Sequence, residues 1–251
     1  MEQLEDLVAE RTRNLEEANK ELAELSKEKD QFLAVLTHDM RTPLTSIKGY
    51  ASILRDREMS REQQVHVAKV VLKSQETLLE IVNNILEIEK LQSGVPILLE
   101  VSEFDVALLA QTIAEALEPQ AVEKKITLHY DKVPSPIVIN ADEQKIERVL
   151  TNLISNAIKY TPEGGEVFVD TAVDGRYALI TIRDTGYGIP EDELPFIFER
   201  YTRVKKHQTV AIGTGLGLAI VKSLVEAHNG EITVKSKEDE GSTFTVKIPI
   251  H

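Results

Sequence analysis

The chain has 251 residues, which at about 150 residues per domain is enough for one or two domains. Its 42% hydrophobic and 28% charged residues support a packed core and exclude intrinsic disorder. The absence of cysteine excludes disulfides, thiolate catalysis and cysteine-ligated zinc, and it fits a reducing compartment. A net charge of −13 argues against nucleic acid or anionic lipid as a partner. We expect no membrane span, because no apolar run reaches about 20 residues, and no signal peptide, because no signal-peptide pattern opens the sequence.

From the N-terminus to about residue 57, apolar residues keep the four-three spacing of a coiled coil. The seam positions are Leu4, Val8, Leu15, Ala18, Leu22, Leu25, Phe32 and Leu36, interrupted by Arg11, Lys29 and Asp39. An unpartnered helix of this kind would expose its apolar stripe to water, so we expect a parallel dimer.

A second helix is expected to begin near Ser60, which forms a capping-box pattern with Gln63. Its apolar face is wider than a two-stranded seam and suits a four-helix bundle of two chains. Ser93-Gly94 and Pro96 predict its end. The face consists of Val67, Val70, Val71, Ser74, Leu78, Leu79, Ile81, Val82, Ile85, Leu86 and Ile88.

The segment LTHDMRTPL, from Leu36 to Leu44, is the most unusual part of this half. His38 lies beside the seam, so its imidazole is expected to face solvent, and Thr42 shares its helix face. Asp39 could hold one ring nitrogen and leave the other free as a nucleophile. The alternative is a surface histidine next to a charge, with Pro43 as a neutral kink.

After a linker, the pattern changes to short strands and helices. Helices are expected at 105–124, 143–160 and 216–228, and strands at 126–130, 137–139, 166–173, 177–183, 231–236 and 243–250. Asp174-Gly175 is a strong hairpin signal. We expect one mixed sheet covered by helices on one face.

Two motifs in this half carry candidate ligands. Asn152, Asn156, Lys159 and Tyr160 share one stripe of the second of these helices, opposite a core stripe, and could meet Mg²⁺ and phosphate. In DTGYGIP, Asp184 at a strand end could accept a hydrogen bond from an exocyclic amine. The alternatives are an exposed polar face and an ordinary glycine-rich turn.

Two further motifs suit an anion. FIFERYTRVKKHQ concentrates Arg200, Arg203, Lys205 and Lys206 in an otherwise acidic chain, although such runs are often only solvated. IGTGLGLAI leads three glycines into a helix, whose free amides suit phosphate. No glycine is followed by lysine, which excludes a P-loop.

In this order the motifs resemble those of sensor histidine kinases, the kinase half of two-component systems. LTHDMRTPL is similar to their phosphoacceptor box and TNLISNAIKYT to their first asparagine box. DTGYGIP, FIFERYTR and GTGLGLAI are similar to the first glycine, phenylalanine and second glycine boxes. The resemblance implies an α+β chain of two domains. A helical hairpin would form a four-helix-bundle dimer behind an N-terminal coiled coil, followed by an α/β sandwich of the GHKL (Bergerat) ATP-binding type.

The resemblance also implies residue roles. His38 would attack the γ-phosphate of ATP, Asp39 would orient its ring, and Thr42 would position water for removing phosphate from a response regulator. Asn156 would bind Mg²⁺, Asn152 would lie near the transfer site, and Asp184 would bind the adenine amino group. The other ATP contacts would come from Lys159, Tyr160, Gly186, Gly188, Ile189, Arg203, Gly213, Thr214, Gly215, Leu216, Gly217 and Leu218, around a lid at about 203–212.

The resemblance divides the chain into a coiled-coil signalling helix (1–29), a dimerisation and histidine phosphotransfer domain (30–93), a hinge linker (94–103) and a catalytic domain (104–251). The expected partners are a second copy, a response-regulator receiver domain and an upstream sensor domain. We expect no nucleic acid, no direct membrane segment and a cytoplasmic location, although a parent protein could be membrane-anchored. Asp39, Ile212 and Tyr201-Thr202 depart from the commoner family residues.

Two other functions stay open at this point. One is an ATPase of the same nucleotide fold, which would need a carboxylate on the asparagine helix to activate water, and Glu147 is available. The other is a non-catalytic coiled-coil scaffold with a degenerate nucleotide site.

Overall fold

The structure is a computed structural model that describes residues 2–56, 58–92, 97–133, 135–200, 202, 204 and 215–250. Within its long helices, the side chains at 2–10, 21, 24–32, 35, 80 and 88–92 lie outside the description. Backbone contacts divide the chain into two compact units, 1–80 and 81–251. Among the described residues, no helix is both long and apolar enough to cross a bilayer.

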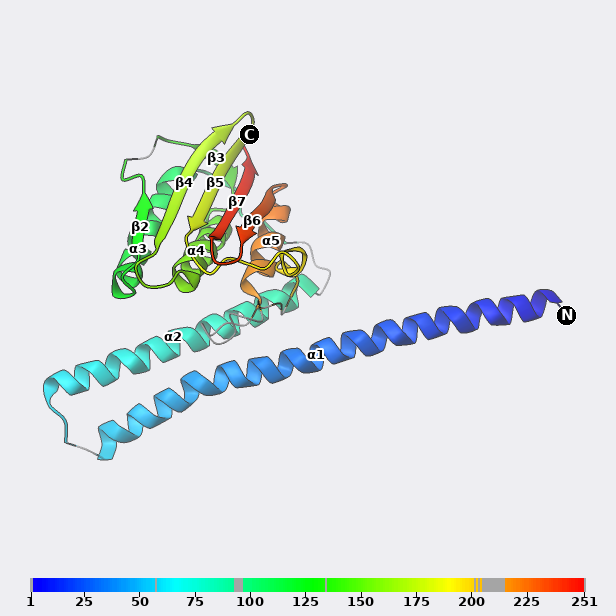
Figure 1. Cartoon of the computed structure of the whole chain (residues 1–251), viewed down its shortest axis with the longest axis horizontal. Coiled ribbons are helices and arrows are strands. Elements are labelled where there is room, and N and C mark those ends of the chain that lie inside the picture. The colour runs from blue at the N-terminus through cyan, green and yellow to red at the C-terminus, as the bar shows by residue number, and fades with distance from the viewer. Residues whose placement is uncertain are drawn as a thin grey trace. The chain divides into compact units, whose positions relative to one another are not determined.

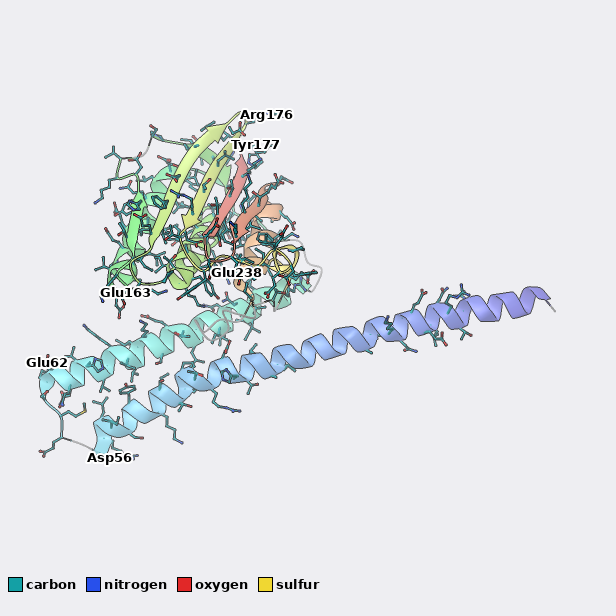
Figure 2. The ribbon with its side chains drawn as sticks, viewed as in Figure 1. Asp56, Glu62, Glu163, Arg176, Tyr177 and Glu238 are labelled. Carbon is teal, nitrogen blue, oxygen red and sulfur yellow. The ribbon has the colours of Figure 1, made fainter. Side chains whose placement is uncertain are left out.

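The first unit contains the helix α1 (Glu2–Asp56) and most of α2 (Arg61–Gln92), which run antiparallel (Figure 1). Asp56 and Glu62 flank the connection between them (Figure 2). The predicted capping box is confirmed, because Ser60 N donates to Gln63 Oε1 at 3.0 Å and Gln63 N to Ser60 Oγ at 3.2 Å. The helix α1 continues through Pro43.

The predicted seam is only partly covered within one chain. Val67 and Asp39 are buried, whereas Leu15 is 67% exposed and Leu22 is similarly open. The seam positions Leu4, Val8, Leu25 and Phe32, and Ile88 of the apolar face of α2, fall outside the described side chains. Since apolar surface in water is unfavourable, the exposed stripe fits a helix that pairs with another chain, and the dimer stays a prediction.

The second unit follows the predicted pattern closely. Its helices are α3 (Val106–Glu123), α4 (Glu143–Tyr160) and α5 (Gly217–Ala227), with a short 3-10 helix at Leu194–Phe196. Its strands are β1 (Ser102–Asp105), β2 (Thr127–Tyr130), β3 (Val138–Ala141), β4 (Glu166–Asp174), β5 (Tyr177–Asp184), β6 (Glu231–Lys237) and β7 (Gly241–Pro249).

The main sheet has the strand order β2-β4-β5-β7-β6. The strand β2 runs parallel to β4 and the other neighbours are antiparallel, as expected for a mixed sheet. Val167 and Val169 are buried while Glu166 and Asp170 are exposed, so the three helices cover one face and the other faces water (Figure 1).

The prediction of a single sheet was wrong. The strand β3 pairs with β1 in a separate antiparallel ribbon, in which Phe104 lies opposite Ile139. In the sequence SEFD of β1 only one of four residues is apolar, so alternation gives no signal there. Its last residue, Asp105, then caps α3 by accepting from the backbone N–H groups of Ala107 and Leu108.

Candidate active site

His38 lies on α1 with its imidazole in solvent, as predicted, and its side chain is 77% exposed. The neighbouring Asp39 is buried, and its Oδ1 lies 3.2 Å from His38 Nδ1. If Nδ1 carries the proton toward this carboxylate, Nε2 keeps its lone pair. Nε2 makes no hydrogen bond within the described residues. The geometry therefore presents an oriented imidazole with one free nitrogen.

Thr42 lies one turn after His38 on the same exposed face. Its Oγ1 is 3.4 Å from the carbonyl oxygen of His38, at the long end of hydrogen-bonding distance. A hydroxyl held so loosely can turn toward a ligand.

The two predicted stripes of α4 are present. Leu150, Leu153 and Ile154 are fully buried, whereas Asn152 and Asn156 are half-buried. Asn152 Nδ2 donates to the carbonyl of Arg148 at 2.9 Å.

At the C-terminal end of the polar stripe, Asn156 makes no side-chain hydrogen bond within the described residues. Its amide oxygen is therefore available to a ligand. About one turn after Asn156, Lys159 Nζ lies 5.4 Å from the centre of the Tyr160 ring, which is within the range of a cation–π contact.

Asp184 is the last residue of β5 and is almost fully buried. Its Oδ1 accepts from the backbone N–H groups of Gly186 at 2.8 Å and Ser242 at 3.2 Å. Burial raises the pKa of Asp184 from its ordinary 3.8 to about 6, although these two hydrogen bonds oppose the shift. Its Oδ2 makes no hydrogen bond within the described residues, so it remains an acceptor for a bound group.

The two glycines of DTGYGIP allow this loop to pack closely against neighbouring backbone segments. A Cβ on Gly186 would lie 2.5 Å from the carbonyl oxygen of Tyr160. Gly188 has φ +63°, and a Cβ there would lie 1.9 Å from the carbonyl oxygen of Lys237. The loop is thus wedged between the end of α4 and the β6–β7 turn. Ile189, the next residue, is buried and donates its N–H to Ser236 Oγ at 2.8 Å.

The second glycine box reaches the asparagine stripe. Gly217 begins α5, and a Cβ on it would lie 3.0 Å from Asn152 Oδ1. Gly215 has a left-handed φ of +68°, Leu216 is fully buried, and Leu218 is half-buried. The N-terminal amides of α5 therefore lie beside the polar stripe of α4, where they suit an anion.

The residues labelled in Figure 2 mark the two ends of the sheet. Glu163 and Glu238 lie at one end, and Arg176 and Tyr177 at the other. Asp184 pairs with Ser242, close to the turn that holds Glu238. The C-terminal end of α4 reaches the same region, since Tyr187 N donates to the carbonyl of Tyr160 at 3.2 Å. Asp184, Asn156 and Gly217 thus belong to one end of the second unit.

Several predicted positions lie outside the described residues. They are Tyr201, Arg203, Lys205, Lys206, Ile212, Gly213 and Thr214, together with most of the expected lid. Arg200 is described and exposed.

Sequence reasoning missed Ser242 and Gly241. Ser242 supplies one of the two amides on Asp184, and a Cβ on Gly241 would lie 2.0 Å from the Asp184 carbonyl oxygen. A glycine that begins a strand in the sequence EGSTF was the available signal, because such a residue marks a close backbone approach.

The residues present fit a magnesium ion bound mainly through a nucleotide. The amide oxygen of Asn156, which accepts no hydrogen bond within the described part of the chain, is a hard ligand, and Mg²⁺ in such sites takes most ligands from phosphates and water. Within the described part of the chain, no group of three or more histidines and carboxylates could hold a metal by itself.

Comparison with known families decides the class of the protein. Residues 28–94 match the family described as "His Kinase A (phospho-acceptor) domain". Residues 141–251 match "Histidine kinase-, DNA gyrase B-, and HSP90-like ATPase". The first match contains His38 and the second contains Asn156 and Asp184. This chain belongs to the sensor histidine kinases.

Similar curated proteins are histidine kinases as well. The circadian input-output histidine kinase CikA of Synechococcus elongatus is 36% identical over 254 residues, which cover 98% of this chain and 33% of CikA. The sensor histidine kinase RcsC of Escherichia coli is 34% identical over 243 residues, which cover 94% of this chain and 25% of RcsC. The chain spans less than half the length of the curated relatives it matches.

Solved histidine kinases have the same fold. Full-length ShkA in complex with AMPPNP superposes with a TM-score of 0.62 at 32% identity, covering 88% of this chain and 45% of ShkA. ThkA in complex with the response regulator TrrA also gives a TM-score of 0.62, and at 22% identity it supports the fold alone.

Proposed function

We propose that this chain is an ATP-dependent protein-histidine kinase that phosphorylates His38. The observation that carries the proposal is the exposed imidazole of His38, held at Nδ1 by the buried Asp39. Nε2 forms a bond to the γ-phosphorus of ATP while the bond from that phosphorus to the bridging oxygen breaks, which releases ADP. Asp39 stabilises the positive charge that develops on the ring.

The second unit binds the ATP in this proposal. Asp184 Oδ2 accepts from the adenine amino group, because a carboxylate at the end of a strand can pair with an exocyclic amine. Lys159, Tyr160 and the N-terminal amides of α5 contact the phosphates. Asn156 is the protein ligand of Mg²⁺, which when bound neutralises charge on the phosphates. The AMPPNP found with ShkA supports a nucleotide at this fold.

The partners follow from the same chemistry. A phosphorylated histidine is a donor for an aspartate, so we propose that a response-regulator receiver domain accepts the group. Thr42 would position water if the chain also removes that phosphate. The exposed seam around Leu15 and Leu22 supports a homodimer.

A reaction that consumes ATP is expected in the cytoplasm.

The geometry of α4 argues against a water-activating ATPase. Such an enzyme needs a carboxylate on the stripe that faces the nucleotide. The stripe carries Arg148, Asn152, Ser155, Asn156 and Lys159, none of which is acidic. Glu147 is exposed and lies about 140° around the helix from Asn152, at 100° per residue.

Incubation with ATP that carries a label on its γ-phosphate separates the three candidate functions. The chain incubated with Mg-ATP should acquire a label that is stable in base and lost in acid, as a phosphoramidate is. Steady release of phosphate without labelled protein would instead favour the ATPase. Neither label nor nucleotide binding would favour the scaffold.

Replacing Asn156 by Asp should raise the dissociation constant for Mg-ATP at least tenfold. The change adds a negative charge beside the triphosphate, and it breaks no described hydrogen bond of the fold. Isothermal titration with and without Mg²⁺ measures the effect, and light scattering should show an unchanged oligomeric state.

The matched control for this prediction is Asn140→Asp, which adds the same charge at an exposed position of β3 in the same unit. It should leave Mg-ATP affinity within twofold of wild type. Equal weakening by both variants would mean that net charge, and not the position of Asn156, governs binding.

A further inference from the structure

The C-terminal end of α4 is capped by a side chain from another helix. The last four carbonyl groups of an α-helix have no partner within the helix and need one elsewhere. Two of those in α4 are satisfied nearby. The Ala157 carbonyl accepts from Thr161, through its N–H at 3.1 Å and its Oγ1 at 2.7 Å. The Tyr160 carbonyl accepts from Tyr187 N at 3.2 Å.

The other two carbonyls meet Lys124, 34 and 35 residues earlier in the chain. Lys124 Nζ donates to the carbonyl of Ile158 at 2.9 Å and to that of Lys159 at 2.6 Å. Carbonyl dipoles give the end of a helix partial negative charge, which favours a cation there, while burial lowers the pKa of Lys124 and opposes this effect. Lys124 thus supplies both a charge and two hydrogen bonds to the last turn of α4.

The position of Lys124 is fixed by the way α3 ends. Lys124 is the C-cap of α3, and Lys125 follows it with a left-handed φ of +57°. Lys125 N donates to the carbonyl of Val122 at 2.9 Å, and Ile126 N to that of Ala121 at 2.8 Å. These two bonds form a Schellman motif, which sets the direction of the chain at this point.

The loop after α4 is tied to the same place. Gly164 N donates to the carbonyl of Lys125 at 3.0 Å, and Thr127 N donates to that of Gly165 at 3.0 Å. The ends of α3 and α4 are therefore joined by backbone bonds, so Lys124 spans a short and well-defined distance to its two acceptors.

We propose that Lys124 is a positioning residue for the nucleotide, which holds the last turn of α4 so that Lys159 and Tyr160 can contact the phosphates. The inference rests on the proposed function, since it assumes that this turn binds ATP. Lys124 acts only through backbone carbonyls on the turn and does not contact the nucleotide. Its loss leaves two carbonyl groups without the partner they have now, and the final turn should fray.

The test uses Lys124→Met in the full chain, because Met keeps an unbranched apolar stem without the charge or donors. The KM for ATP in histidine labelling should rise about tenfold, while the labelling rate at saturating ATP stays within about twofold of wild type. Hydrogen exchange should speed up in a peptide spanning 155–162 and remain unchanged in β4. Lys124→Arg, which restores donors and charge, should recover most of the ATP affinity.

The control is Lys125→Met, at the next position. Lys125 is exposed, and its Nζ pairs with Glu163 rather than with a helix end, so this variant should keep wild-type KM. A Lys124→Met variant with wild-type KM would overturn the inference. So would a loss of rate with faster exchange throughout the unit, which indicates general destabilisation. Absence of label on the wild-type chain would instead refute the proposed function.

Discussion

Replacing His38 by Ala is expected to abolish the acid-labile label completely while leaving ATP binding unchanged. The variant removes the only side chain in the proposal that forms a bond to phosphorus. The His38 side chain is exposed and makes one described contact, with Asp39, so its loss should cost the fold little. Labelling, followed by titration with a fluorescent ATP analogue, measures the two quantities separately.

His66→Ala is the matched control, because His66 is also an exposed histidine on a long helix of the first unit. It should label like wild type. If His38→Ala retained the label and His66→Ala lost it, the acceptor would be on α2 and the assignment of LTHDMRTPL would be wrong.

Elements with a strong local signal were predicted well from the sequence. The helix α4 has the predicted bounds, because its two stripes persist over five turns and Asp142 caps its start by accepting from Lys145 N. The hairpin turn at Gly175 follows from a dipeptide that tolerates left-handed φ. In such cases neighbouring residues carry enough information.

Contacts between distant segments were not predictable in this way. Asp184 was predicted to be a ligand, and its second backbone donor, Ser242, lies 58 residues away in the chain. Lys124 looked like an ordinary charged residue at a helix end until the fold placed it against α4. Such contacts depend on strand pairing and helix packing, which a single sequence does not specify by local pattern.

Replacing Asp184 by Asn should weaken ATP binding by about 10- to 100-fold and, at neutral pH, stabilise the second unit. A hydrogen bond to a charged group contributes about 1.5–3 kcal/mol, which sets the expected loss. Asn can keep Oδ1 as acceptor for Gly186 and Ser242. It places an N–H donor where Oδ2 would accept from the adenine amino group, so donor meets donor.

The gain in stability follows from the raised pKa of Asp184. Folding moves that pKa from 3.8 to about 6, so the folded state binds the proton more tightly. The favourable contribution is complete below pH 3.8 and is lost as pH rises through 6. Above pH 7 the buried charge costs on the order of 3 kcal/mol relative to the neutral form. Calorimetric unfolding should thus show Asp184→Asn more stable than wild type at pH 8, with the difference shrinking toward pH 4.5.

The pH dependence of ATP binding gives an independent check. Wild-type affinity should fall about tenfold between pH 8 and pH 5 as Asp184 takes up a proton, whereas Asp184→Asn should vary much less. Asp170→Asn, which removes a carboxylate at an exposed position of β4, controls for the loss of one negative charge and should follow wild type. Inosine triphosphate, which has a carbonyl in place of the amino group, should bind Asp184→Asn at least as well as ATP does. If Asp184→Asn kept the wild-type ratio of affinities for ATP and inosine triphosphate, Asp184 would not recognise the amino group.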